Sequence, residues 1–73
     1  MKRIDCLGEI CPYPMLLLQK EYDALCSGES VLLVTDHHCT LSAVGVYCDA
    51  QGFRYSPNEV IPGVWEITIE AKQ

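Results

Sequence analysis

Cys11 is the residue of this sequence whose neighbours most favour a reactive thiol. Pro12 and Pro14 follow it, and an apolar run with helical spacing comes next, so Cys11 is expected just outside the first turn of a helix. Unpaired backbone amides and the positive end of the helix dipole favour a thiolate there, and the thiolate is the nucleophilic form of cysteine. Cys11 is therefore the candidate nucleophile.

A second group of reactive side chains follows an apolar strand pattern and consists of Asp36, His37, His38 and Cys39. Cys39 precedes a second predicted helix, as Cys11 precedes the first, and is a candidate second thiol. The two adjacent histidine side chains diverge, so one of them is expected to face a thiol, where an imidazolium lowers the thiol pKa and a neutral ring acts as base. Asp36 is expected to cap the loop or the second helix.

The cysteines number five, and they lie at positions 6, 11, 26, 39 and 48. An odd count without a secretion signal argues against a disulfide framework, and the spacings match neither Cys-x-x-Cys nor the usual zinc templates. Cys6, Cys26 and Cys48 are predicted to lie in the core. No metal or other cofactor is expected, although Cys11, Cys39 and a histidine remain a chemically suitable zinc set.

Length and charge narrow the class of protein. The 73 residues carry a net charge of −5, and the five basic residues are scattered, so direct nucleic-acid binding is not expected. The sequence has neither a signal-peptide pattern nor an apolar run of about 18 residues, which predicts a cytoplasmic protein that is not embedded in a membrane. We expect residues 1–73 to form a single domain and a monomer.

The order of apolar patterns and breakers predicts βαβαββ. The expected strands cover residues 2–6, 30–35, 53–56 and 64–70; the expected helices run from Pro12 or Pro14 to about residue 26 and from Thr40 or Ser42 to near residue 52. Tyr13, Met15 and Trp65 are predicted to pack in the interior.

These elements form an α+β two-layer sandwich, with a four-stranded mixed sheet and two helices packed on one face. Since the first two strands are parallel, the loops 7–11 and 36–39 are expected to emerge at the same edge. The apolar run 31–34 points to both faces of the sheet, so the uncovered face has either a small exposed patch or a docked partner.

The run Asp5-x-x-Gly8-x-x-Cys11-Pro12-x-Pro14 resembles the TusA family (SirA/YedF-like) of small sulfur carriers, and the resemblance covers essentially the whole chain. It implies a βαβαββ sandwich in which Cys11 accepts sulfane sulfur as a persulfide and passes it to an acceptor protein. By this match, Gly8, Pro12, Pro14 and Asp36 support the site.

The run from Asp36 to Cys39 is similar to the YeeD-like branch, which is associated with YeeE/YedE-type membrane transporters and thiosulfate uptake. The likeness implies that Cys39 joins Cys11 in handling sulfur, and that sulfur donors, acceptors and such a transporter are partners. The predicted function is a sulfurtransferase acting as a persulfide carrier. Two alternatives are a non-catalytic adaptor or regulator of a transporter, and a Cys/His metal or redox module.

Overall fold

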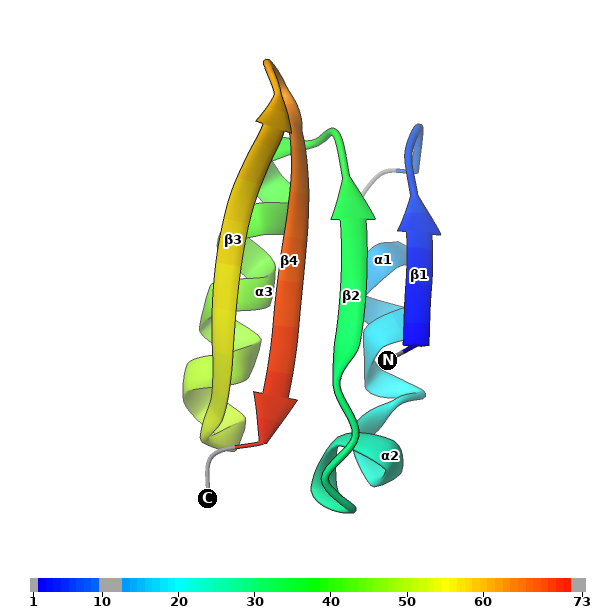
Figure 1. Ribbon diagram of the computed structural model, residues 1–73, viewed down its shortest axis with the longest axis vertical. Helices are drawn as coiled ribbons and strands as arrows, with labels where there is room; N and C mark the ends of the chain where they lie inside the picture. Colours follow the sequence, from blue (N-terminus) through cyan, green and yellow to red (C-terminus); the bar gives the residue numbers. More distant parts are fainter. Residues whose placement is uncertain (1, 10–12, 72–73) are drawn as a thin grey trace.

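A computed structural model of the chain describes residues 2–9 and 13–71. Its elements are, in order, β1 (Lys2–Cys6), α1 (Tyr13–Gln19), α2 (Tyr22–Cys26), β2 (Val31–Thr35), α3 (His38–Gln51), β3 (Phe53–Ile61) and β4 (Val64–Ala71). Within these residues the strands form a four-stranded sheet in the order β1-β2-β4-β3, and the helices cover one of its faces (Figure 1). The predicted α+β sandwich is confirmed.

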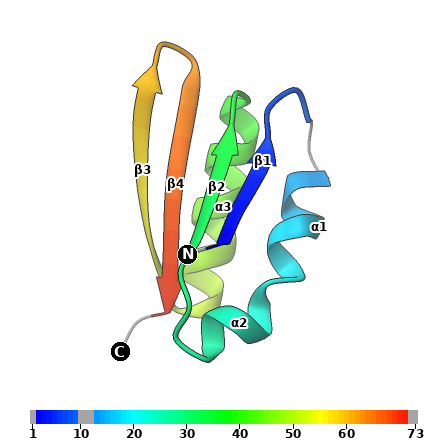
Figure 2. The ribbon, with the colours of Figure 1, turned by 45° about the vertical axis from the view of Figure 1, so that its right-hand side comes forward.

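The strand directions decide where the loops lie. β1 runs parallel to β2, with Lys2 opposite Val31 and Cys6 opposite Thr35. β4 runs antiparallel to both of its neighbours, β2 and β3. The turned view in Figure 2 shows α1 beside the β1 edge, with the loops that follow β1 and β2 at the same end of the sheet. This end of the sheet is where the sequence predicts the reactive residues.

The core lies between the sheet and the helices, and the strands supply it by alternation. On β4, Ile67 and Ile69 are fully buried, whereas Thr68 between them points to the opposite face. On α3, Val44 and Cys48 are fully buried, one helical turn apart. The buried apolar cluster consists of Ile4, Cys6, Leu18, Leu25, Val31, Leu33, Val44, Cys48, Phe53, Ile67 and Ile69.

The first predicted helix is wrong in one respect, because it is divided between Gln19 and Tyr22. The Glu21 N–H donates to the Leu18 carbonyl oxygen (2.9 Å), three residues back, and the Glu21 carboxylate pairs with the Lys2 ammonium (3.2 Å). Leu18 and Leu25 are buried, whereas Cys26, the last residue of α2, is exposed. The prediction that Cys26 lies in the core is therefore wrong.

Two further boundaries differ from the predicted ones. α3 begins at His38, and Thr40, predicted as a cap, lies inside the first turn and is fully buried. β3 continues through Pro57, which the sequence suggested for a loop. A proline fits there because β3 is an edge strand with β4 on one side only. Sheets tolerate a proline, which has no N–H to donate, on such an edge strand.

The uncovered face of the sheet carries Leu32 and Val34 of β2. Val34 is only 2% exposed and Leu32 is half-buried. Arg3 on one side of β2 and Glu66 on the other form an ion pair (3.8 Å) on this face. Val34 is thus covered and Leu32 stays partly exposed, so the apolar area that this face exposes is small, and docking of a partner there stays a prediction.

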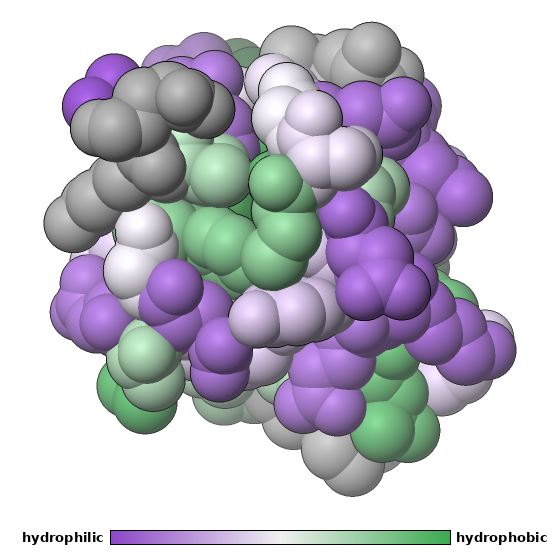
Figure 3. Space-filling model, turned by 90° about the horizontal axis from the view of Figure 1, so that it is seen from below, coloured by the Kyte–Doolittle hydropathy of each residue, from purple (hydrophilic) through white to green (hydrophobic). Residues whose placement is uncertain are grey.

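Aromatic side chains close the end of the molecule away from the two loops. The rings of Tyr22 and Tyr47 lie 5.8 and 6.2 Å from the ring of Phe53. Figure 3 shows this end, where a hydrophobic area is surrounded mainly by hydrophilic side chains. The rings thus extend the core to the start of β3.

Gly45 lets α3 approach β3 closely. A Cβ atom at this position would lie 3.0 Å from the Tyr55 hydroxyl oxygen and 3.4 Å from Cζ of the same ring. We expect Gly45→Ala to destabilise the protein by about 1 kcal/mol, because this contact outweighs the gain in helix propensity. Urea unfolding of the purified variant measures the change.

Tyr55→Phe supplies the matched background for this substitution, because it removes only the oxygen atom at 3.0 Å. In that background Gly45→Ala should be neutral or stabilising, with a coupling free energy of about 0.5–1 kcal/mol between the two positions. Equal effects of Gly45→Ala in both backgrounds would show that the Tyr55 hydroxyl does not limit the approach.

Candidate functional site

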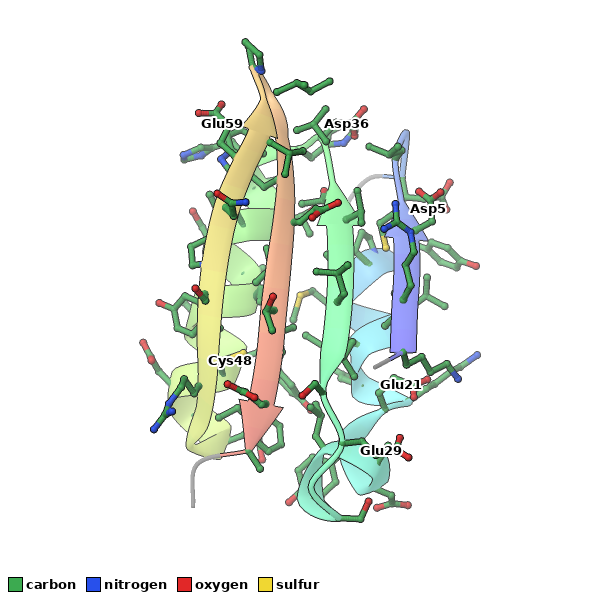
Figure 4. All side chains as sticks on the ribbon, viewed as in Figure 1. Asp5, Glu21, Glu29, Asp36, Cys48 and Glu59 are labelled. Carbon is green, nitrogen blue, oxygen red and sulfur yellow. The ribbon has the colours of Figure 1, made fainter. Side chains whose placement is uncertain are left out.

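A hydrogen bond joins the loops that follow β1 and β2. The Gly8 N–H donates to Asp36 Oδ1 (3.1 Å), across 28 positions of sequence. Asp5 and Asp36 both lie toward the same end of the sheet, as Figure 4 shows. The predicted meeting of the two loops at one edge is confirmed, and its connecting atom is an Asp36 carboxylate oxygen.

The loop after β1 is fixed by three consecutive amides. The Leu7 N–H donates to Asp5 Oδ1 (3.1 Å), Gly8 donates to Asp36, and the Glu9 N–H donates to the Cys6 carbonyl oxygen (3.0 Å). The backbone φ of Gly8 is 80°, a value that glycine adopts without strain. This explains why the site needs glycine three residues before Cys11.

The loop after β2 turns at once into α3. The His37 N–H donates to the Thr35 hydroxyl oxygen (3.2 Å), and the His37 carbonyl oxygen accepts the Thr40 N–H (3.1 Å). His37 is the residue that precedes the helix, and its side chain does not cap it. Its ring Nδ1 instead lies 2.8 Å from Asp36 Oδ1.

Asp36 is held in its ionised form. The hydrogen bond from the Gly8 N–H is the main cause that lowers the pKa of this carboxyl. Loss of hydration is the second effect and opposes it, and the contact with His37 lowers the pKa further. Asp36 therefore caps the loop, which is one of its two predicted roles.

The two histidines contact different partners. His38 is the first residue of α3, and its ring meets the ring of Trp65 edge-on at a centroid distance of 6.0 Å. Trp65 is paired with Thr35 at the start of β4 and is partly buried, as predicted. Of the two rings, His37 is thus the one bound to the carboxylate that joins the loops.

The cysteines fall into distinct environments. Cys6 and Cys48 are fully buried, as predicted. Burial is the main cause that raises the pKa of both thiols. It raises the pKa of Cys48 to about 11. At Cys6, repulsion from the charges of Glu9 and Asp5 adds to the effect of burial. Cys39, the second residue of α3, is exposed at the site, and Cys26 is exposed at the far end. Cys6 and Cys48 are consequently unsuited to nucleophilic chemistry at neutral pH.

Several predicted site residues require separate mention. Cys11 and Pro12 lie outside the described residues. Pro14 is buried in the first turn of α1, where proline is favoured. Tyr13 was predicted to pack inside, but it is 48% exposed, and Leu16 next to it on the helix is 51% exposed. Leu7, before the undescribed segment, is 46% exposed, so apolar side chains occur on both sides of Cys11 in the sequence.

Sequence analysis missed three residues that shape the site. Asp5 was named only as the first residue of the family motif, although an aspartate that binds the amide two residues later is a known turn signal. Thr35 positions His37, and Trp65 holds His38. The first of these two contacts is local, because the Thr35 hydroxyl binds the amide two residues later as Asp5 does, whereas the second depends on the strand pairing that brings Trp65 beside Thr35 and leaves no local signal.

The metal set suggested by the sequence, Cys11 with Cys39 and a histidine, includes a residue outside the described segments, so that alternative stays a prediction. In these two segments no group of three or more His, Cys, Asp and Glu side chains is arranged to hold a metal ion. The helices of the described chain are all too short or too polar to cross a membrane.

Comparisons with known proteins agree with this geometry. The family model "Sulfurtransferase TusA" matches residues 2–71. A protein of Methanocaldococcus jannaschii named "putative sulfur carrier protein" is 32% identical over 53 residues, which cover 73% of this chain and 71% of that protein. A SirA-like protein from Desulfitobacterium hafniense has a similar crystal structure, with a TM-score of 0.85, 28% identity and 100% coverage of both chains. This chain therefore belongs to the TusA family and has the role of a sulfur carrier.

Proposed function

We propose that Cys11 carries the sulfur as a persulfide. The Cys11 thiolate attacks the outer sulfur of a sulfane-sulfur donor such as thiosulfate, the donor S–S bond breaks, and sulfite leaves with the electron pair: Cys11–S⁻ + S–SO₃²⁻ gives Cys11–S–S⁻ + SO₃²⁻. The observation that carries the proposal is the Gly8–Asp36 hydrogen bond (3.1 Å). Cys11 follows Gly8 by three residues, a length of chain that reaches at most about 11 Å.

Cys39 is proposed as the second thiol of this reaction. It is exposed in the first turn of α3, two residues after the ring that binds Asp36. Its thiolate attacks the inner sulfur of the protonated persulfide, Cys11–S–SH. The S–S bond of the persulfide breaks, a Cys11–Cys39 disulfide forms, and the outer sulfur leaves with the bonding electron pair and its proton as HS⁻. This step delivers sulfide when no acceptor protein takes the sulfur directly.

A sulfur carrier must meet donor and acceptor proteins, and exposed apolar side chains suit such contacts. Leu7, Tyr13 and Leu16 are each about half exposed in the loop and helix on either side of Cys11, and Val60 and Ile61 are exposed at the β3–β4 turn. In Figure 1 that turn lies at the same end of the sheet as the two loops. We propose that these residues contact the partners, and that one partner is the cytoplasmic side of a YeeE/YedE-type transporter.

The experiment that tests the proposal is mass spectrometry of the intact protein after incubation with thiosulfate. At early times, before Cys39 resolves the persulfide, the chain should gain about 32 Da, the mass of one sulfur atom, and peptide mapping should place it on residue 11. Treatment with a reductant should remove the added mass and release sulfide. Sulfur found only on Cys26, or on no residue, would contradict the assignment.

A further inference from the structure

The β3–β4 hairpin extends beyond the rest of the sheet. β2 pairs with β4 only as far as Trp65, which lies opposite Thr35, whereas β3 continues to pair with β4 up to Ile61 and Val64. Beyond Trp65, the hairpin tip (residues 60–64) has no third strand beside it. Figure 1 shows this tip projecting past the ends of β1 and β2, on the side of the two loops.

Large apolar side chains occupy the hairpin tip. Val60 is 43% exposed and Ile61 is 60% exposed, and Pro62, which follows them, is exposed as well. Turns are built mainly from glycine, proline and short polar residues, so the turn itself does not require Val60 and Ile61. Scattered apolar side chains are common on protein surfaces, but adjacent ones at a projecting end form a patch, and such patches mark sites of interaction.

The hairpin tip is held in one shape before any partner binds. The Gly63 N–H donates to Glu59 Oε2 (3.0 Å), which closes the turn between the two strands. The backbone φ of Gly63 is 83°, in the region that glycine adopts without strain. Because the tip is already ordered, docking costs little conformational entropy. Val60 and Ile61 can therefore enter an apolar recess of a partner without rearrangement of the turn.

The side chains around the hairpin tip carry negative charge. Asp5, Asp36 and Glu59 are exposed and lie toward this end of the molecule, as Figure 4 shows. The Lys and Arg residues of the sequence are at positions 2, 3, 20, 54 and 72, outside the two loops and the tip. Arg3 is bound to Glu66. A matching partner surface must be positively charged around an apolar centre, since opposite charges attract across an interface and like charges repel.

We propose that the hairpin tip anchors this chain on a protein surface that has an apolar recess bordered by Lys and Arg side chains. The inference rests on the proposed function, in which a partner contacts the chain at this end of the sheet. The cytoplasmic side of a transporter fits this description, because cytoplasmic loops of membrane proteins are enriched in Lys and Arg. A lipid surface or a nucleic acid fits less well, since both are anionic and the carboxylates around the tip repel them.

The test uses a synthetic amphipathic helix of about 18 residues with leucine on one face and lysine on the other, and a matched peptide with glutamate in place of lysine. Trp65 is the single tryptophan of the chain and pairs with Glu59 at the base of the tip, so its fluorescence reports docking there. The lysine peptide should bind at least about tenfold more tightly than the glutamate peptide, and salt should weaken it. Equal binding of the two peptides, or binding of neither, would overturn the proposal.

A matched pair of variants tests the apolar anchor. Val60→Ser combined with Ile61→Ser should weaken binding of the lysine peptide by about tenfold, because two aliphatic side chains are no longer buried in the complex. Val46→Ser is the control, since Val46 is 71% exposed but lies in the middle of α3, outside the tip. The control should bind within about twofold of the unmodified chain. Equal weakening in the variant and its control would contradict the assignment of the anchor.

A second pair tests the charge. Glu59→Gln keeps an oxygen that accepts the Gly63 N–H and removes only the negative charge, so binding of the lysine peptide should weaken by about two- to threefold. Glu29→Gln is the control, because Glu29 is exposed at the opposite end of the molecule, and it should leave binding unchanged. A larger effect of Glu29→Gln than of Glu59→Gln would place the basic partner at the wrong end and refute the proposal.

Nuclear magnetic resonance of the ¹⁵N-labelled chain locates the contact. The largest shift changes on adding the lysine peptide should fall on residues 59–64 and on the loops after β1 and β2, and changes centred on Tyr22 would count against the proposal. Vesicles containing phosphatidylglycerol should not change Trp65 fluorescence; insertion of the tip into them would show a membrane as the occupant instead. If the unmodified chain takes up no sulfur from thiosulfate, the proposed function fails. The peptide titrations require no sulfur and still decide the docking surface, so the two failures are distinguishable.

Discussion

A Cys11→Ser variant is expected to take up no sulfur from thiosulfate, whereas the unmodified chain gains about 32 Da. A serine hydroxyl is not ionised at neutral pH and attacks sulfane sulfur far more weakly than a thiolate. Of the other cysteines, Cys6 and Cys48 are fully buried and have raised thiol pKa values, so they cannot replace the lost nucleophile. Mass spectrometry of the intact variant after incubation with thiosulfate measures the loss.

The matched control is Cys26→Ser, because Cys26 is an exposed cysteine at the other end of the molecule. This variant should load sulfur to the same extent as the unmodified chain. Cys39→Ser should also load, and its adduct should persist longer, since the thiol that resolves the persulfide is gone. Sulfur that still accumulates on Cys11→Ser would contradict the assignment of the carrier thiol.

The same variant distinguishes the carrier from a binding protein that transfers no sulfur. A non-catalytic adaptor of a transporter would bind its partner through exposed side chains such as Leu7 and Leu16, without the thiol. Thiosulfate-dependent growth that is unchanged by Cys11→Ser would favour the adaptor. Growth that depends on Cys11 and is unaffected by Cys26→Ser would favour the carrier.

The order of elements was predictable because local signals mark it. Strand alternation fixes which face of β1 and β4 is buried, and Gly28 and Gly52 follow the ends of helices. The division between α1 and α2 has no such signal, since neither proline nor glycine occurs there. The division coincides with the ion pair between Glu21 and Lys2. Lys2 lies 19 positions earlier in the sequence, and only the fold brings the two side chains together.

The site was predictable at the level of loops but not of atoms. Parallel pairing of β1 and β2 is enough to bring the two loops to one edge. The choice of Gly8 as the partner of Asp36 depends on strand register, and the different roles of His37 and His38 depend on where Trp65 lies. Adjacent histidines look equivalent in a sequence, and only their non-local contacts distinguish them.

Leu33→Ala is expected to have the largest effect on stability. Leu33 is fully buried in the central strand β2 and lies between Ile4 of β1 and Ile67 of β4. Removing a leucine side chain from such a site costs about 2–5 kcal/mol, through lost burial and the cavity that remains. In a domain of this size the melting temperature should fall by roughly 10–25 °C. Thermal unfolding followed by circular dichroism measures the shift.

Leu32→Ala is the matched control, because it removes the same atoms from the neighbouring position on the opposite face. Leu32 is only half-buried and lies beside Arg3 and Thr68, so its loss should cost less than about 1.5 kcal/mol. Equal destabilisation by both variants would mean that the two faces of β2 are equally buried. That result would contradict a structure in which the helices pack on one face of the sheet only. Since β2 ends at Thr35, directly before Asp36, Leu33→Ala should also loosen the loop that holds His37. Sulfur loading should then fall at temperatures well below the unfolding transition of the unmodified chain.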